Sequence, residues 1–67
     1  MNTLSYIIYE QIEIGELVAV EKSLTKKLRK IEEVECYPLI FDEEQKSMKI
    51  DFENKIFVET KYLKIAK

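Results

Sequence analysis

The chain has 67 residues, which is enough for one small domain (1–67) and leaves no room for a second. It contains one cysteine and no histidine, so an intramolecular disulfide, a Cys/His zinc site and a histidine-activated nucleophile are excluded. With 46% hydrophobic and 36% charged residues, one glycine and one proline, the composition is that of a folded domain and not of a disordered linker.

Residues 3–14 fit two patterns almost equally well. As a strand, the segment alternates with five apolar residues on one face: Leu4, Tyr6, Ile8, Ile12 and Ile14. As a helix, it would end at Gly15, pair with the next segment in an αα-hairpin and be followed by a three-stranded meander. The four isoleucines, two tyrosines and one threonine of the segment favour the strand, which is our prediction.

Residues 16–33 show the spacing of an amphipathic helix. Apolar residues recur at steps of three or four: Leu17, Val20, Leu24, Leu28 and Ile31, with Val34 continuing the row. No glycine or proline interrupts the segment, and most of its residues favour helices. We therefore predict a helix over about 16–34, roughly 27 Å long, with its apolar stripe packed on a sheet.

The rest of the chain predicts strands. Pro38 favours extended backbone before it and suits a strand start or an edge, so residues 39–41 are predicted as a strand. Residues 42–45 form a polar turn without glycine, which predicts a loop longer than two residues. Residues 47–53 alternate apolar and charged side chains, and a further strand is predicted from residue 56 to about 63.

The apolar pattern also predicts a register for the last hairpin. A three-residue loop at 53–55 aligns one apolar row with another, since Ile56, Val58 and Thr60 then face Phe52, Ile50 and Met48. A two-residue loop would bury charges instead. The predicted fold is a single α+β domain with one helix on an antiparallel sheet, in the order β-α-β-β-β.

In that arrangement a set of apolar residues points away from the helix. Its members are Ile7, Tyr9, Ile40, Phe57 and Leu63. A cluster of large apolar side chains on one sheet face is typical of an interaction surface, and a core this small favours self-association. We predict a partner protein or a second copy at this face. The alternative is that the C-terminal segment folds back and covers it.

A basic row on the predicted helix suggests a second function. Lys22, Lys26, Arg29 and Lys30 would share one helix flank, which is able to contact nucleic-acid phosphates. The chain as a whole is acidic, with a net charge of −2 and a pI near 5.1, whereas nucleic-acid-binding domains are mostly basic. Nucleic-acid binding is therefore the alternative hypothesis.

Nothing in the sequence indicates catalysis, a metal or a cofactor. Cys36 has no cationic neighbour in sequence to lower its pKa, which predicts a buried structural thiol. No signal peptide and no run of about 20 apolar residues is present, so we expect a cytoplasmic protein without a membrane segment. The predicted function is a small protein-interaction module of a regulatory or inhibitory type, and not an enzyme.

Overall fold

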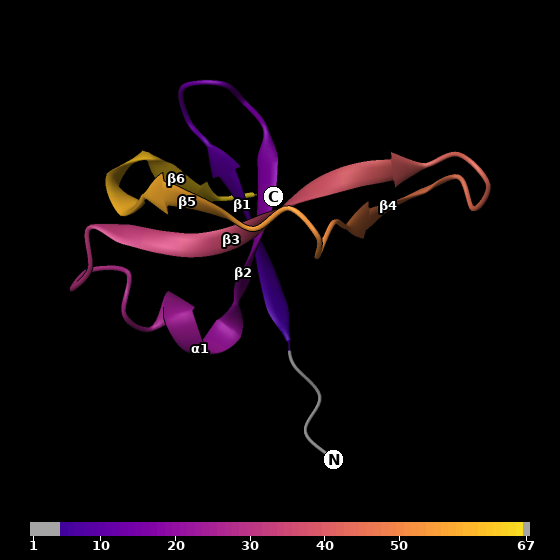
Figure 1. The fold of residues 1–67 in the computed structure, drawn as a ribbon. Coiled ribbons are helices and arrows are strands. Elements are labelled where there is room, and N and C mark those ends of the chain that lie inside the picture. Colours follow the sequence, from indigo (N-terminus) through magenta and orange to yellow (C-terminus); the bar gives the residue numbers. More distant parts are fainter. Residues whose placement is uncertain (1–4, 67) are drawn as a thin grey trace, which may run out of the picture.

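The structure is a computed structural model that describes residues 5–66, and it is built almost entirely from antiparallel strands. Figure 1 shows the arrangement. The strands are β1 (Tyr6–Gln11), β2 (Leu17–Glu21), β3 (Glu33–Asp42), β4 (Ser47–Ile50), β5 (Ile56–Glu59) and β6 (Leu63–Ile65). The helical elements are short: α1 (Lys22–Thr25) and the 3-10 turn η1 (Thr60–Tyr62).

The strands form one sheet in the order β4-β3-β2-β1-β6, with β5 also paired to β3. β1 and β2 form a hairpin in which Tyr9 lies opposite Val18, and β6 returns to the other edge of β1. The turn of this hairpin is closed by two backbone hydrogen bonds, from Gly15 N to Gln11 O (2.7 Å) and from Gln11 N to Glu16 O (2.8 Å). The first and last strands of the sheet are thus neighbours.

β3 is the longest strand, and it changes partner along its length. Residues 39–42 pair with β4, and residues 33–36 pair with β5. Between these two ladders β3 has two residues (37–38), whereas the opposite chain has five (51–55), so three extra residues bulge out there.

Both β4 and β5 lie on the same edge of β3. The carbonyls of Pro38 and Glu32 accept hydrogen bonds from Asp51 N and Thr60 N, at 2.9 and 2.8 Å. These carbonyls are an even number of residues apart, and carbonyls along an extended strand alternate between its edges, so both face one edge. The missing N–H of Pro38 faces this edge too, at the point where the ladder is interrupted.

The core lies on the inner side of β1, β2 and the first half of β3. Val18, Val20 and Cys36 are fully buried, and Val34 and Tyr9 are nearly so. Alternation explains this set, because Tyr9 faces Val18 across the β1–β2 hairpin while Val34 and Cys36 face Val58 and Ile56 of β5. Partly buried residues pack around it: Ile7, Leu24, Leu28, Ile31, Ile56, Val58 and Leu63.

The predicted helix over about 16–34 is wrong. Residues 17–21 form β2, α1 has only four residues, and turns lead from it to β3. The physical reason is the run Val18-Ala19-Val20, in which all three residues are fully buried, whereas a helix with the predicted stripe would bury only Val20. Burial on both faces of a strand overrode the helix propensity of the segment. The order β-α-β-β-β is accordingly replaced by β-β-α-β-β-β, with η1 before a last strand β6.

Several strand predictions are confirmed. Residues 6–11 of the first segment form a strand, which contradicts the αα-hairpin alternative, and residues 3–4 of that segment lie outside the described residues. The strand at 39–41 lies within β3, and the polar loop before β4 is four residues long (43–46). The three-residue hairpin at 53–55 is wrong, because β4 and β5 pair with β3 and not with each other.

Substitution of Gly15 tests the backbone conformation of the β1–β2 turn. Its φ of +70° lies in the left-handed region, and a Cβ there would meet only Glu10 Oε2, at an ordinary 3.9 Å. Gly15→Ala should therefore lower the free energy of unfolding by about 1 kcal/mol through backbone strain alone. Gly15→Asn should lose less, because asparagine tolerates this region better. Urea unfolding of the three chains measures both values, and an alanine variant as stable as the wild type would contradict the turn.

Candidate interaction surface

The β3–β4 hairpin projects from the rest of the molecule, and we call residues 39–50 the arm (Figure 1). β4 ends the strand order, and within residues 5–66 its only paired strand is β3. The arm therefore exposes both of its faces and one backbone edge.

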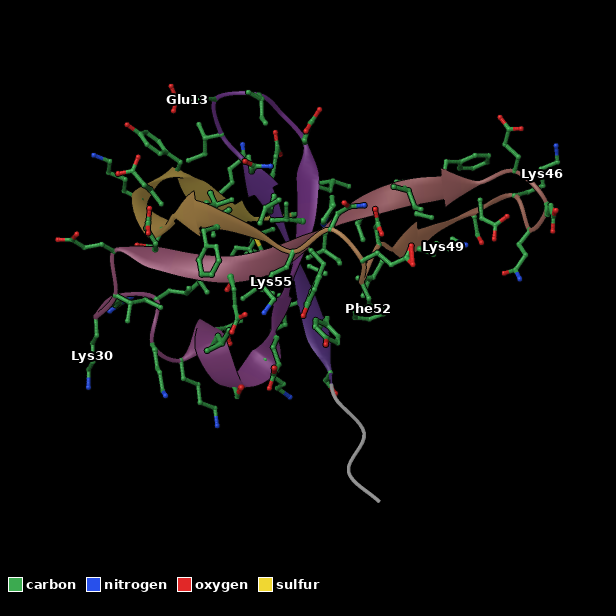
Figure 2. The ribbon with its side chains drawn as sticks, in the orientation of Figure 1. Glu13, Lys30, Lys46, Lys49, Phe52 and Lys55 are labelled. Carbon is green, nitrogen blue, oxygen red and sulfur yellow. The ribbon has the colours of Figure 1, made fainter. Side chains whose placement is uncertain are left out.

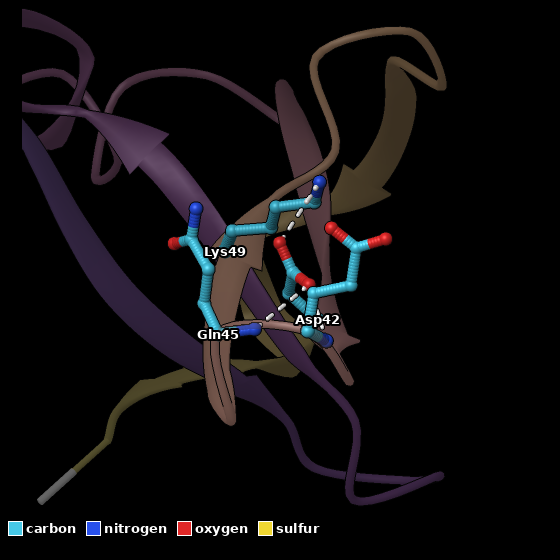
Figure 3. A network of polar contacts seen from close by, with 4 residues as sticks. Asp42, Gln45 and Lys49 are labelled. Carbon is cyan, nitrogen blue, oxygen red and sulfur yellow. Dashed lines mark hydrogen bonds and ion pairs between the residues drawn. The ribbon is translucent and has the colours of Figure 1, made fainter.

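The tip of the arm is fixed by its own polar groups (Figure 3). Asp42 Oδ1 accepts hydrogen bonds from the backbone N–H groups of Glu44 and Gln45, at 2.9 and 3.2 Å. Asp42 Oδ2 lies 3.5 Å from Lys49 Nζ on the opposite strand. The Gln45 N–H, the Glu44 N–H and the Lys49 ammonium together lower the pKa of Asp42. Lys46 takes a φ of +56°, which closes the turn. The arm is thus an ordered hairpin despite its exposure.

Large apolar side chains line the arm. The register places Leu39 opposite Ile50 and Phe41 opposite Met48, so these four residues share one face. Phe41 is 56% exposed and Met48 is 52% exposed. On the other face Ile40, which is 40% exposed, lies opposite Lys49.

An aromatic cluster continues this face at the base of the arm. Tyr37 lies two residues before Leu39 and therefore on the same side of β3. Its ring packs edge-on against Phe52 (centroids 5.2 Å apart) and Tyr6 (6.2 Å), and Tyr6 and Phe52 are 5.4 Å apart. Loss of hydration, with Tyr37 and Glu21 nearby, raises the pKa of Tyr6.

Phe52 remains largely exposed although it belongs to this cluster. It lies in the bulged segment 51–55, close to the body of the molecule (Figure 2). We call the whole surface the arm face; its residues are Tyr6, Tyr37, Leu39, Phe41, Met48, Ile50 and Phe52.

The five apolar residues predicted from the sequence to bind a partner do not lie together. Tyr9 is only 7% exposed and belongs to the core, and Ile7 and Leu63 pack against that core. Ile40 lies on the arm, and Phe57, 65% exposed, lies on β5. Of the predicted set, two residues are accessible to a partner, and only Ile40 is part of the arm.

None of the seven arm-face residues belongs to the partner surface that the sequence predicts. The sequence predicts Met48, Ile50 and Phe52 as one apolar row, on the side of the sheet that the predicted helix would cover. Alternation indicates which residues share a face and not which face is buried. Since the helix does not form, this side stays open.

The basic residues lie in α1 and the turns after it. Lys22, Lys26, Arg29 and Lys30 are all exposed, and none of them forms an ion pair with another residue of the described chain. They do not form a helix flank, because α1 ends at Thr25, but they remain close in sequence (Lys30 is labelled in Figure 2). A pocket that includes Arg29 has both signs of charge in its lining, from Arg29 and Lys61 and from Glu32 and Glu59.

Within residues 5–66, no group of three or more histidine, cysteine or acidic side chains is placed to hold a metal ion. No helix in the same range is long and apolar enough to cross a membrane. Comparison of the chain with models of protein families, with curated proteins and with solved structures found no match. The arm face is therefore the candidate site on geometry alone.

Cys36 is fully buried, which confirms the predicted structural thiol. Burial raises the pKa of this thiol from about 9 to about 11, because the thiolate would lose its hydration. We expect the folded chain at pH 8 to react with a thiol reagent only at the rate at which it opens. Rapid labelling without denaturant would contradict this burial.

The raised pKa also sets a pH dependence. Burial of the neutral thiol favours the folded state. This contribution to the free energy of unfolding is fully present below the pKa of the thiol in the unfolded chain, and it is lost as the pH rises through about 11. The free energy of unfolding should therefore fall more steeply above pH 9 in the wild type than in Cys36→Ala.

Proposed function

We propose that this chain is a small cytoplasmic protein-interaction module, of a regulatory or inhibitory type, that binds a protein through the arm face. One observation carries the proposal. The arm is an ordered hairpin whose largest apolar side chains, Phe41 and Met48, are more than half exposed.

The core does not need these side chains. The buried residues come from β1, β2 and the first half of β3, and none comes from the arm. Exposed apolar residues are ordinary when they are scattered, but contiguous ones mark binding surfaces. Cross-strand pairing makes the arm face contiguous, from Phe41 and Met48 at its outer end to Phe52 at its base.

The turn chemistry supports a binding role. Asp42 holds the arm in shape before any partner arrives, so little conformational entropy is lost on binding. Aromatic and methionine side chains are enriched at protein interfaces, and the arm face contains both kinds.

The test separates binding from stability. Phe41→Ser with Met48→Ser should change the free energy of unfolding by less than about 1 kcal/mol, since both residues are exposed. Proteins retained from the source cell by the wild-type chain on a resin should be lost by this double variant. Ile14→Ser is the matched control, because Ile14 is 60% exposed in the β1–β2 turn, away from the arm. Equal retention by all three chains would refute the proposal.

A second candidate function rests on the basic residues. The segment from Lys22 to Lys30 carries five exposed cations, Lys27 included, that have no ion-pair partner in the described chain. Such a cluster attracts phosphates even on an acidic protein. If it binds nucleic acid, Lys26→Glu with Arg29→Glu should weaken retention on DNA by at least tenfold at low salt. Retention that is absent in the wild type, or unchanged in this variant, would eliminate this candidate.

A further inference from the structure

The outer edge of β4 offers unpaired backbone groups. Asp51 N donates to Pro38 O, so the backbone N–H and C=O groups of Asp51 point toward β3. Because these groups alternate along a strand, those of Lys49 and Ser47 point toward β3 as well. The N–H and C=O groups of Met48 and Ile50 then point outward. No strand of the described chain covers this edge. An open edge of this kind is a template for another strand.

We propose that the edge of β4 pairs antiparallel with β4 of a second copy of this chain, with Met48 opposite Met48 of that copy. This inference rests on the proposed function and names its partner. Two arms related by a twofold axis would join into one four-stranded sheet.

Backbone geometry restricts the register. When two β4 edges pair antiparallel, a residue whose N–H and C=O groups point outward must lie opposite another such residue, because these groups bond to each other. On β4 these are Met48 and Ile50. An axis at Ser47 would need residues 44–46 as a strand, but they form the turn, with Lys46 at a φ of +56°. The twofold axis therefore falls at the Met48 pair, the neighbouring Lys49 pair or the Ile50 pair. A pair centred on Ile50 would need residues 51–54 as a strand, but the chain there forms the bulge that places Phe52 against Tyr37.

Charge selects between the two remaining registers. An axis at Lys49 would set two ammonium groups directly opposite each other, at the closest cross-strand distance, which is unfavourable. An axis at Met48 sets Lys49 opposite Ser47 of the other copy, and each Lys49 keeps its own Asp42 as partner. The Met48 register is therefore favoured.

The Met48 register also joins the two arm faces. Phe41 lies opposite Met48 within each arm, so pairing places Phe41, Met48 and their two counterparts in one apolar row across four strands. A second copy supplies both the strand edge and the matching apolar row, which is why it is the occupant that fits. The edge is short, with four residues in β4, so the dimer belongs to the small-interface class and its Kd is expected to be on the order of micromolar or weaker.

Sedimentation velocity tests the pairing from about 1 µM to 1 mM, a range chosen to span that affinity. The wild-type chain should pass from monomer to dimer. Met48→Lys should raise the Kd at least tenfold, because it sets two charges opposite each other at the axis. Ile14→Lys, an equally exposed apolar position on the β1–β2 turn, should leave the Kd unchanged.

Cysteine cross-linking tests the register. Met48→Cys chains should form a disulfide-linked dimer under mild oxidation, and Lys49→Cys chains should form it much more slowly. The native Cys36 is buried, and the wild-type chain serves as its control. Preferential linkage through the Lys49→Cys position would overturn the register.

A chain that stays monomeric up to 1 mM, or a dimer that Met48→Lys leaves intact, overturns self-pairing. Neither result removes the proposed function. If the Phe41→Ser, Met48→Ser chain still loses proteins that the wild type retains, the arm binds a different protein. If self-pairing fails and this variant also retains every protein that the wild type retains, both proposals fail.

Discussion

Pro38 has no backbone N–H, and it stands in the middle of the longest strand. A continuous antiparallel ladder along that edge of β3 would need a donor at this position. The opposite chain makes one more hydrogen bond, from Asp51 N to Pro38 O (2.9 Å), then leaves β3 and rejoins it at Ile56. The separation of β4 from β5, the bulge at 51–55 and the placement of Phe52 all follow from this interruption.

The interruption divides β3 into two parts with different surroundings. Before Pro38, Val34 and Cys36 face the core and are covered by β5, β2 and the segment around α1. After Pro38, the strand continues with β4 alone, and Ile40, Phe41 and Met48 of this hairpin are exposed. The same alternation that builds a core in one half therefore builds an exposed apolar surface in the other. In the turn of that half, Asp42 Oδ1 accepts hydrogen bonds from the N–H groups of Glu44 and Gln45.

The sequence predicted local structure well where one periodicity was unambiguous. The strand predicted at 39–41 lies within β3, and the polar turn before β4 is present. The strands predicted at 47–53 and from 56 to about 63 are shorter, since β4 ends at Ile50 and β5 ends at Glu59, where η1 begins. The segment 16–34 failed because helical spacing and the buried run Val18-Ala19-Val20 coexist in it, and the choice depends on β1 and β3, which are distant in sequence. Leu24, Leu28 and Ile31 still pack against the core. The helical spacing therefore predicted these core contacts, although the residues do not lie in a long helix.

The surface was harder to predict than the strands. Ile40 and Phe57 are exposed as expected, whereas Tyr9 is buried because its side of β1 faces the core, with Val18 opposite it. Met48 lies on the face that the predicted helix would cover, and this face is exposed because the helix does not form. Which face of a strand is buried depends on what covers it, and that information lies in the whole fold.

Residue-resolved amide hydrogen exchange of the monomer tests the central claim that one strand serves both a core and a free arm. The amides that face a neighbouring strand in the core, such as those of Val34 and Cys36 toward β5, should exchange only through global unfolding, and the paired amides of the arm through local opening. Within β4, the Lys49 amide should be protected and the Met48 and Ile50 amides should exchange freely. Uniform protection from residue 16 to 33 in a helical pattern, or protection of the Met48 amide in the monomer, would contradict this structure.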